Sequence, residues 1–271
     1  MIFDTAGKST SPAIVMLNGS FTDGKSLLPI AEKLADEYYI IIPTYDGHHE
    51  NGGIFTTREE QVRKIAEHLK EENITRLALI QGISMGAEIA LDLAAYLYEE
   101  DEIEVNRCFF DGGPFFSFPL PVRLIMQKKF MSFVDGCRYG TDEEIIARFK
   151  ENSFVKWVAK GDITPFREMI LGMASVAKYM SDTSVCNESD ACYTFDFPYV
   201  PYTEQKKYYF SWSSDEPARE SKSAILDNYP DAKFINAGKL GHGGFILKKP
   251  DKYAEVMRKL ASPRKIKEDK T

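Results

Sequence analysis

LALIQ, GISMG and AEIALDLAAYL follow one another between residues 77 and 97. The first is a short apolar run typical of a buried strand, and the last has the apolar spacing of a helix. Between them, Gly82-Ile83-Ser84-Met85-Gly86 predicts a tight strand-to-helix turn with Ser84 at its tip. Such a turn brings the residues two before and two after the serine against neighbouring backbone, and both are glycine here. We therefore predict that Ser84 lies above a sheet at a helix N-terminus, as a candidate nucleophile.

The alternation of strand and helix extends on both sides of this turn. Apolar runs predict buried strands at Ala13–Leu17, Tyr38–Ile42, Leu77–Ile80, Val105–Phe110, Lys207–Trp212 and Lys233–Ala237. Helical spacing occurs at Ser26–Tyr38, Thr57–Glu72, Ala87–Tyr98, Pro217–Tyr229 and Pro250–Ala261. Repeated strand–helix units with buried strands predict an α/β fold with a mostly parallel sheet and helices on both faces.

The rhythm is interrupted between residues 114 and 201. This segment has helical patterns at 121–134, 141–150 and 164–180 and no strand-like run. We predict a core made of residues 1–113 and 202–271, and a helical cap inserted at 114–201. The cap is rich in large apolar side chains, some of which we expect to line an apolar pocket: Phe115, Phe116, Phe118, Met126, Phe130, Met131 and Phe133.

Composition excludes several classes of protein. The 271 residues carry a formal net charge of −7, which disfavours nucleic-acid binding as the main role. Hydrophobic residues make up 44% of the chain, enough for a sizeable core. No apolar run approaches the ~20 residues that span a bilayer, and the first eleven residues lack the pattern of a secretory signal. We expect a cytoplasmic protein with no membrane partner, and the sequence carries no sign of its oligomeric state.

The cysteines and histidines do not suggest a metal site. Four cysteines are scattered without a C-x-x-C pair, and no histidine cluster has the spacing of metal ligands. We expect reduced, partly buried thiols at Cys108, Cys137, Cys186 and Cys192. No metal is expected.

A nucleophilic serine needs a general base, and His242 is the best candidate among four histidines. It stands between glycines after the last predicted strand, on a loop that can place an imidazole over the sheet edge. His68 is expected on the polar side of its helix. His48 and His49 follow the second strand, where ordering a loop or lining a pocket is the expected role.

The third member of such a site is a carboxylate that follows a strand and precedes His242 in the chain. We predict Asp215, which follows Lys207–Trp212 and leaves room for one helix and one strand before His242. Glu216 is adjacent and could take its place. Asp111 is the other alternative, because it also ends a strand at the same edge. The order Ser84, Asp215, His242 matches one hydrolase architecture and neither the trypsin-like nor the subtilisin-like order.

Acyl transfer also needs two hydrogen-bond donors for the oxyanion that forms. The Met85 N–H directly follows the candidate nucleophile and supplies one. The other is expected from the loop Asn18-Gly19-Ser20-Phe21, with the Ser20 N–H preferred over that of Phe21.

These motifs together resemble the α/β-hydrolase superfamily over nearly the whole chain. The matching pieces are the loop at Asn18, Pro43-x-x-Asp46-Gly47-His48, the turn at Ser84, Ser213-Ser214-Asp215 and the Gly-His242-Gly loop. The resemblance implies an eight-stranded, mostly parallel sheet, a variable cap after the sixth strand, and no cofactor. The chain departs from the family at its start, where the opening hairpin is reduced to Met1–Asp4, and at Asn18, where the family usually has His.

The expected activity is that of a serine hydrolase acting on a small-molecule carboxylic ester or thioester through an acyl-enzyme. A serine nucleophile argues against the dehalogenase and epoxide-hydrolase branches, which use Asp at this position. Because one fold serves many chemistries, three alternatives stay open: a C–C bond hydrolase, a peptidase, and a non-enzymatic ligand sensor that keeps the pocket.

Overall fold

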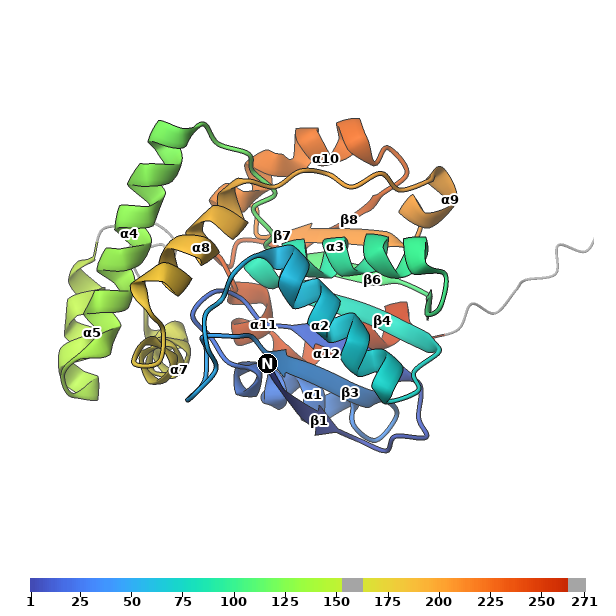
Figure 1. The fold of residues 1–271 in the computed structure, drawn as a ribbon, viewed down its shortest axis with the longest axis horizontal. Helices are drawn as coiled ribbons and strands as arrows, with labels where there is room; N and C mark the ends of the chain where they lie inside the picture. Colours follow the sequence, from blue (N-terminus) through green and yellow to red (C-terminus); the bar gives the residue numbers. More distant parts are fainter. Residues whose placement is uncertain (153–162, 263–271) are drawn as a thin grey trace, which may run out of the picture.

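A computed structural model describes residues 1–152 and 163–262 (Figure 1). Within these residues the strands are β1 (Ile2–Ala6), β2 (Ala13–Leu17), β3 (Tyr39–Thr44), β4 (Arg76–Ile83), β5 (Glu104–Val105), β6 (Cys108–Asp111), β7 (Tyr208–Trp212) and β8 (Lys233–Asn236). They form one sheet in the order β1-β3-β2-β4-β6-β7-β8, and β5 also pairs with β4. Only β1 runs antiparallel to its neighbour among these pairs. The predicted α/β fold with a mostly parallel sheet is confirmed.

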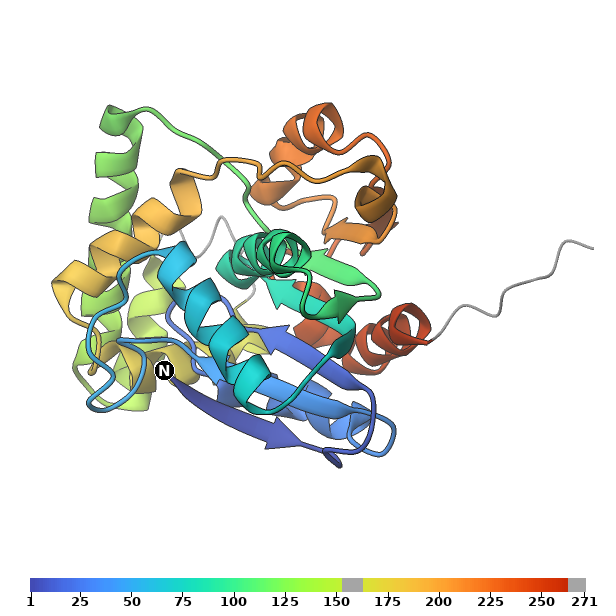
Figure 2. The same cartoon turned by 45° about the vertical axis from the view of Figure 1, so that its right-hand side comes forward.

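Helices cover both faces of this sheet (Figure 2). One face packs against α2 (Arg58–Glu71), α3 (Met85–Glu100) and α10 (Lys222–Asn228), the last preceded by the short η3 (Pro217–Ser221). The other face packs against α1 (Leu28–Leu34), which follows η1 (Gly24–Leu27), and against α11 (Gly244–Lys248) and α12 (Pro250–Ala261). Because both faces are covered, β2 and β3 are buried along their whole length rather than at alternate residues.

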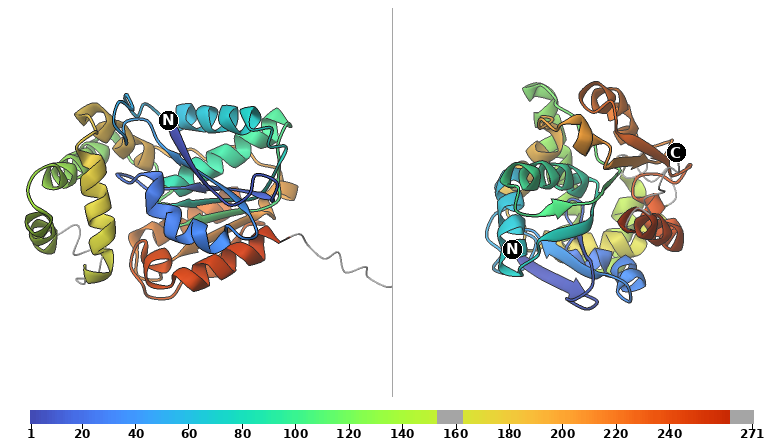
Figure 3. Two further views of the ribbon diagram at one scale, coloured as in Figure 1. Left: turned by 90° about the horizontal axis from the view of Figure 1, so that it is seen from below. Right: turned by 90° about the vertical axis from the view of Figure 1, so that its right-hand side faces the viewer.

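The segment between β6 and β7 contains helices beyond one end of the sheet (Figure 3). These are α4 (Leu120–Arg138), α5 (Asp142–Glu151), η2 (Thr164–Phe166), α7 (Arg167–Ala177) and α8 (Asp182–Tyr193), whereas α9 (Tyr202–Gln205) of the same segment lies near the opposite end of the sheet (Figure 1). Helix α4 packs against α5, α7 and α8, and α8 also contacts α3 of the core. The described residues between β6 and β7 form helices and loops, with one isolated bridge between Ser117 and Thr194. Residues 153–162 of the predicted cap lie outside the described residues, and its action as a cap stays a prediction.

Four local predictions need correction. The strand predicted at Val105–Phe110 is interrupted at Asn106 and Arg107 and forms β5 and β6. The opening segment, predicted as reduced to Met1–Asp4, is one strand that extends to Ala6 and pairs antiparallel with β3. The helix predicted to run to Tyr38 ends at Leu34. Helix α8 has no counterpart among the predicted helical patterns.

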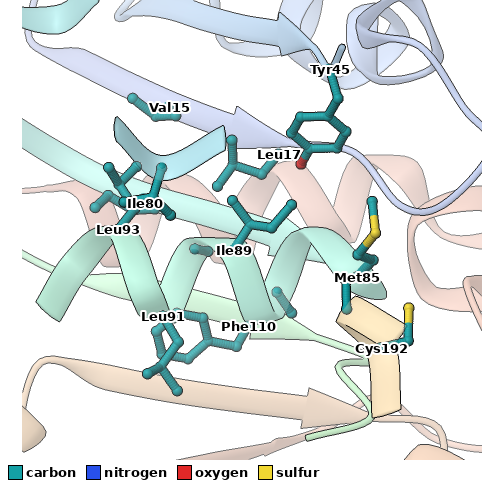
Figure 4. Packing of buried hydrophobic residues seen from close by; sticks show 14 of the residues in the cluster. Val15, Leu17, Tyr45, Ile80, Met85, Ile89, Leu91, Leu93, Phe110 and Cys192 are labelled. Carbon is teal, nitrogen blue, oxygen red and sulfur yellow. The ribbon is translucent and has the colours of Figure 1, made fainter. Parts of the chain in front are cut away.

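The core beneath the candidate nucleophile joins the sheet, α3 and α8. Figure 4 shows Leu17 of β2 beside Tyr45, and Met85 of α3 beside Cys192 of α8. Met85 is fully buried, and Cys192 is 4% exposed. The first turn of α3 is thus wedged between the sheet and α8, which fixes the position of Ser84 directly before it.

Candidate active site

Ser84 lies in the turn between β4 and α3 with φ 55° and ψ −127°. A non-glycine residue rarely adopts a positive φ, so this backbone conformation is strained and must be held by its surroundings. The Ser84 N–H donates to the Asp111 carbonyl over 2.8 Å, and the Ser84 carbonyl accepts from the Ala87 N–H over 2.9 Å. The predicted strand–turn–helix context of Ser84 is therefore present.

The two glycines of the turn are required by close backbone contacts. A Cβ on Gly82 would lie 2.0 Å from the Gly86 carbonyl oxygen. A Cβ on Gly86 would lie 2.3 Å from the Leu17 carbonyl oxygen, on the neighbouring strand β2. Both distances are far below van der Waals contact, so neither position tolerates a larger residue without movement of the backbone.

His242 faces Ser84 from the loop between β8 and α11. Its Nε2 lies 3.0 Å from Ser84 Oγ, so the serine hydroxyl can donate a hydrogen bond to a neutral imidazole. Gly241 and Gly243, on either side, have φ of 74° and 69° and allow the sharp loop. The structure thus places His242 next to Ser84, as the sequence predicted.

Glu216, and not Asp215, is the carboxylate that contacts the imidazole. Glu216 Oε2 lies 2.7 Å from His242 Nδ1, and its other oxygen accepts from the Ser213 N–H over 2.5 Å. The Glu216 side chain is 2% exposed, so both carboxylate oxygens exchange water for protein donors. Asp215, predicted at this position, does not contact the ring, and Glu216, the adjacent alternative, does.

The backbone around Glu216 and the contacts of Asp215 differ, although the two residues are adjacent. Glu216 precedes Pro217, and a residue before proline is held in extended conformation; its φ is −101° and its ψ 149°. In this extended conformation its carboxylate contacts the imidazole. Asp215 instead accepts a hydrogen bond from the Gly241 N–H over 3.1 Å, through Oδ1, and so supports the loop that carries His242.

Two carboxylates determine the protonation of His242. Burial lowers its pKa, but the hydrogen bond and charge of Glu216, together with the charge of Asp111, outweigh burial and raise the pKa above the ordinary value of histidine. Asp111 ends β6 and is 3% exposed. Burial, reinforced by the nearby charge of Glu216, raises the pKa of Asp111 to about 8. Asp111 is not the imidazole's partner.

The candidate oxyanion donors lie on the two loops that flank Ser84. The Met85 N–H belongs to the first turn of α3, where backbone donors have no partner within the helix. A Cβ on Gly19 would be 3.1 Å from Ser84 Cβ, so the loop after β2 runs directly past the candidate nucleophile. Ser20 Oγ lies 3.5 Å from Met85 Sδ. Ser20 and Met85 are thus neighbours, as the prediction requires.

The other histidines lie away from Ser84. His48 is fully enclosed between the core and α8, with Nδ1 2.7 Å from the Thr22 carbonyl oxygen, which agrees with the expected role in ordering a loop. His49 Nδ1 contacts the Glu50 carbonyl at 3.0 Å. His68 is half-buried and stacks on Phe3 with ring centroids 3.6 Å apart, so it is less exposed than predicted.

Aromatic residues of the inserted segment reach the loop that carries Ser20. Phe21 packs edge-on against Phe130 of α4, with ring centroids 5.0 Å apart, and stacks on Phe133 at 5.3 Å. Phe115, in contrast, packs against Phe110 and Phe210 of the sheet, so it belongs to the core. Only part of the predicted apolar cap set therefore lies near the candidate site.

The described residues contain no group of three or more side chains suited to hold a metal ion. The four cysteines are free, and burial raises the pKa of Cys192 well above its ordinary value. Within residues 1–152 and 163–262 no helix is both long and apolar enough to cross a membrane.

Comparison with known proteins identifies the fold. Neither the protein-family models nor the curated proteins contain a match to this chain. Among solved structures, the chain is similar to a protein of the alpha/beta hydrolase family from Desulfitobacterium hafniense, with a TM-score of 0.74 and 17% identity over 96% of this chain and 100% of the other.

Two further structures are similar over the same share of the chain. An enol-lactonase from Burkholderia xenovorans has a TM-score of 0.71 at 14% identity, covering 96% of this chain and 95% of the other. A structure from work on carboxylesterases of the thaumarchaeon Nitrososphaera gargenis has a TM-score of 0.71 at 18% identity, covering 96% and 93%. The chain has the α/β-hydrolase fold, and the resemblance drawn from its motifs is confirmed at the level of fold.

Proposed function

We propose that this chain is a serine hydrolase that cleaves a small-molecule carboxylic ester or thioester through Ser84, His242 and Glu216. The observation that carries the proposal is one continuous chain of contacts: Ser84 Oγ to His242 Nε2 at 3.0 Å, and His242 Nδ1 to Glu216 Oε2 at 2.7 Å. A nucleophile, a base and a group that orients the base are thereby in line.

The reaction begins when Ser84 Oγ attacks the ester carbonyl carbon and its proton passes to His242 Nε2. The carbonyl π electrons move to oxygen, giving a tetrahedral oxyanion that the Met85 and Ser20 N–H groups stabilise. The imidazolium then gives its proton to the departing alcohol or thiol, and the acyl group stays on Ser84. A water molecule, deprotonated by His242, releases the acid by the same steps.

Glu216 acts through the imidazole. Its carboxylate accepts from His242 Nδ1–H, which leaves Nε2 unprotonated and facing Ser84 Oγ. When Nε2 takes the proton, the buried negative charge stabilises the imidazolium. Asp215 is a positioning residue, because it holds the Gly241 N–H one residue before His242.

Ester cleavage is favoured over the alternative reactions by two considerations. A serine elbow with an oxyanion site serves acyl transfer directly. The similar solved structures include an enol-lactonase and a structure from work on carboxylesterases, both names that refer to cleavage of ester bonds. We further propose that residues 114–201 act as a cap that sets the acyl or alcohol preference, since Phe130 and Phe133 contact the loop beside Ser84.

The test is labelling with a fluorophosphonate probe, followed by turnover of p-nitrophenyl esters of increasing acyl length. We expect stoichiometric labelling at Ser84 and hydrolysis of at least the short esters. Ser84→Ala should lose both, with kcat reduced by up to ~10⁶-fold. Activity retained in pure Ser84→Ala protein would refute the proposal. A wild-type protein that binds esters without labelling would favour the ligand sensor.

A further inference from the structure

Buried side chains hold the loop from Asn18 to Thr22 along its length. Asn18 Nδ2 donates to the Thr22 carbonyl over 2.5 Å, and Thr22 Oγ1 donates to the Gly19 carbonyl over 2.8 Å. The Tyr45 hydroxyl donates to the Asn18 carbonyl over 3.0 Å. We call this segment, Asn18–Thr22, the oxyanion loop, since Ser20 is its proposed donor.

His48 adds a contact from outside the loop. Its Nδ1 lies 2.7 Å from the Thr22 carbonyl oxygen, which can only accept, so Nδ1 must carry a proton. On the opposite side of the ring, Nε2 contacts Glu188 Oε1 of α8. Both side chains are completely buried. His48 therefore links the oxyanion loop to a helix of the inserted segment.

The two contacts restrict where the protons of this pair lie. Either His48 is an imidazolium facing the Glu188 carboxylate, or a neutral imidazole accepts from a protonated Glu188; the Nδ1–H donates to Thr22 in both cases. Burial lowers the pKa of His48, and the charge and hydrogen bond of Glu188 outweigh it, so the pKa is raised. The bond to the Thr22 carbonyl is thus maintained in either arrangement.

We propose that His48, through its contact with the Thr22 carbonyl, is a positioning residue for the Ser20 N–H of the oxyanion loop. Between Ser20 and Thr22 stands only Phe21, which has a positive φ of 62°. Fixing the Thr22 carbonyl on one side of this turn fixes the direction of the Ser20 amide on the other. The proposal rests on the proposed function, because the position of the Ser20 N–H matters only if Ser84 attacks a carbonyl and an oxyanion forms.

Two amide substitutions separate the two contacts of the ring. His48→Asn places its Nδ2 near the original Nδ1 and keeps the donor to Thr22, but loses the contact with Glu188. His48→Gln places its Nε2 near the original Nε2 and keeps the contact with Glu188, but loses the donor to Thr22. Both variants remove the ring, so each serves as the matched control of the other.

The readout is inhibition by an alkyl trifluoromethyl ketone, compared with KM for a matched ester. Ser84 Oγ adds to the ketone carbon, the proton goes to His242, and the resulting oxyanion depends on the same donors as the transition state. In His48→Gln we expect the inhibition constant and kcat each to worsen by about tenfold or more, with KM within about twofold. In His48→Asn we expect all three within about threefold of wild type.

Each variant has an expected outcome of its own, and the comparison between them supplies a further test. Equal effects in the two, unchanged inhibition in His48→Gln, or a tenfold loss in His48→Asn would overturn it. If neither variant folds, ¹⁵N spectra of the wild-type histidine rings decide, because an unprotonated His48 Nδ1 is incompatible with the proposal. Failure of the proposed function has a separate signature: wild type itself would then neither label nor turn over esters.

Discussion

Asp215 and Glu216 are adjacent carboxylates with different contacts, and this difference predicts different kinetics. Glu216→Gln removes the charge beside His242 Nδ1 and lets the amide donate to the ring, which favours the wrong tautomer. We expect kcat/KM to fall by about 10⁴-fold. Asp215→Asn keeps an oxygen that accepts from the Gly241 N–H, so we expect less than about a tenfold loss. Steady-state hydrolysis of one ester by both variants is the measurement, and a reversed order of effects would contradict the assignment.

The pH profile follows from the protonation of the same histidine. His242 must be neutral to accept the serine proton, so kcat/KM should fall as the pH drops through its pKa. Because the hydrogen bond and charge of Glu216 raise that pKa, the acidic midpoint should lie above the ordinary value of 6.5.

A Glu216→Gln variant tests the origin of this shift. Without the carboxylate charge the imidazolium is less stable, so the midpoint of the residual activity should move to lower pH. Profiles of kcat/KM between pH 5 and 9 would measure it, with Asp215→Asn as the control whose midpoint should stay near that of wild type. An identical midpoint in wild type and Glu216→Gln would show that another group titrates.

At the scale of residues, the sequence alone predicted the positions of those candidate site residues that are flanked by glycines with a restricted backbone. Ser84 lies between two glycines that tolerate no Cβ, and His242 lies between two with positive φ. The choice between Asp215 and Glu216 depended instead on which side chain an extended backbone turns toward the ring. The restriction imposed by Pro217 on its predecessor was the one signal that favoured Glu216.

At the scale of elements, the turn between β4 and α3 makes a prediction about packing. Gly86→Ala puts a Cβ 2.3 Å from the Leu17 carbonyl, so the helix or β2 must move. We expect a loss of about 1–3 kcal/mol in the free energy of unfolding and a fall in kcat, since Ser84 moves with the helix. Urea unfolding and ester hydrolysis would measure the two effects.

Gly172→Ala is the matched control for this change. Gly172 lies within α7, where an added Cβ meets nothing within 4 Å. Alanine has the higher helix propensity, so stability should rise by about 0.5–1 kcal/mol, and labelling of Ser84 should be unaffected. Equal losses in both variants would mean that the turn at Gly86 is not specially restricted.

Periodicity predicted a helix that buries one apolar stripe and missed a helix that buries polar side chains. Helix α12 was predicted with its observed bounds because one apolar stripe faces the sheet. Helix α8 was not predicted, because the residues it buries include Ser184, Glu188 and Ser189. Ser184 Oγ accepts from the Phe55 N–H over 3.1 Å, a tertiary contact that no local pattern reveals.

At the scale of the whole molecule, the inserted segment should determine substrate choice. Phe130 of α4 is 7% exposed and contacts Phe21 of the oxyanion loop. Phe130→Leu shortens this side chain, so we expect KM to change in a way that depends on acyl length, on the order of tenfold between the favoured and disfavoured esters. Fluorophosphonate labelling of Ser84 should persist. Tyr139→Ala, at a position 72% exposed on the same segment, is the control, and an equal change there would argue against a cap.

The global topology was predictable because it depends on pattern rather than on individual contacts. Continuous apolar strands that alternate with amphipathic helices favour a parallel sheet covered on both faces, whichever residues pair. The pattern did not predict how α8 contacts the core, because residues 140 positions apart in the sequence, His48 and Glu188, make one of these contacts.

The separation of Ser84 from His242 has a consequence for the time at which the protein becomes active. The two residues are 158 positions apart, and β7 and β8 join the sheet at the edge opposite β1. A ribosome adding about 5–20 residues per second makes His242 roughly 8–30 s after Ser84. During that interval the nascent chain carries the proposed nucleophile but not the proposed base. On the proposed mechanism, a nascent chain cannot begin to hydrolyse an ester before His242 has been made.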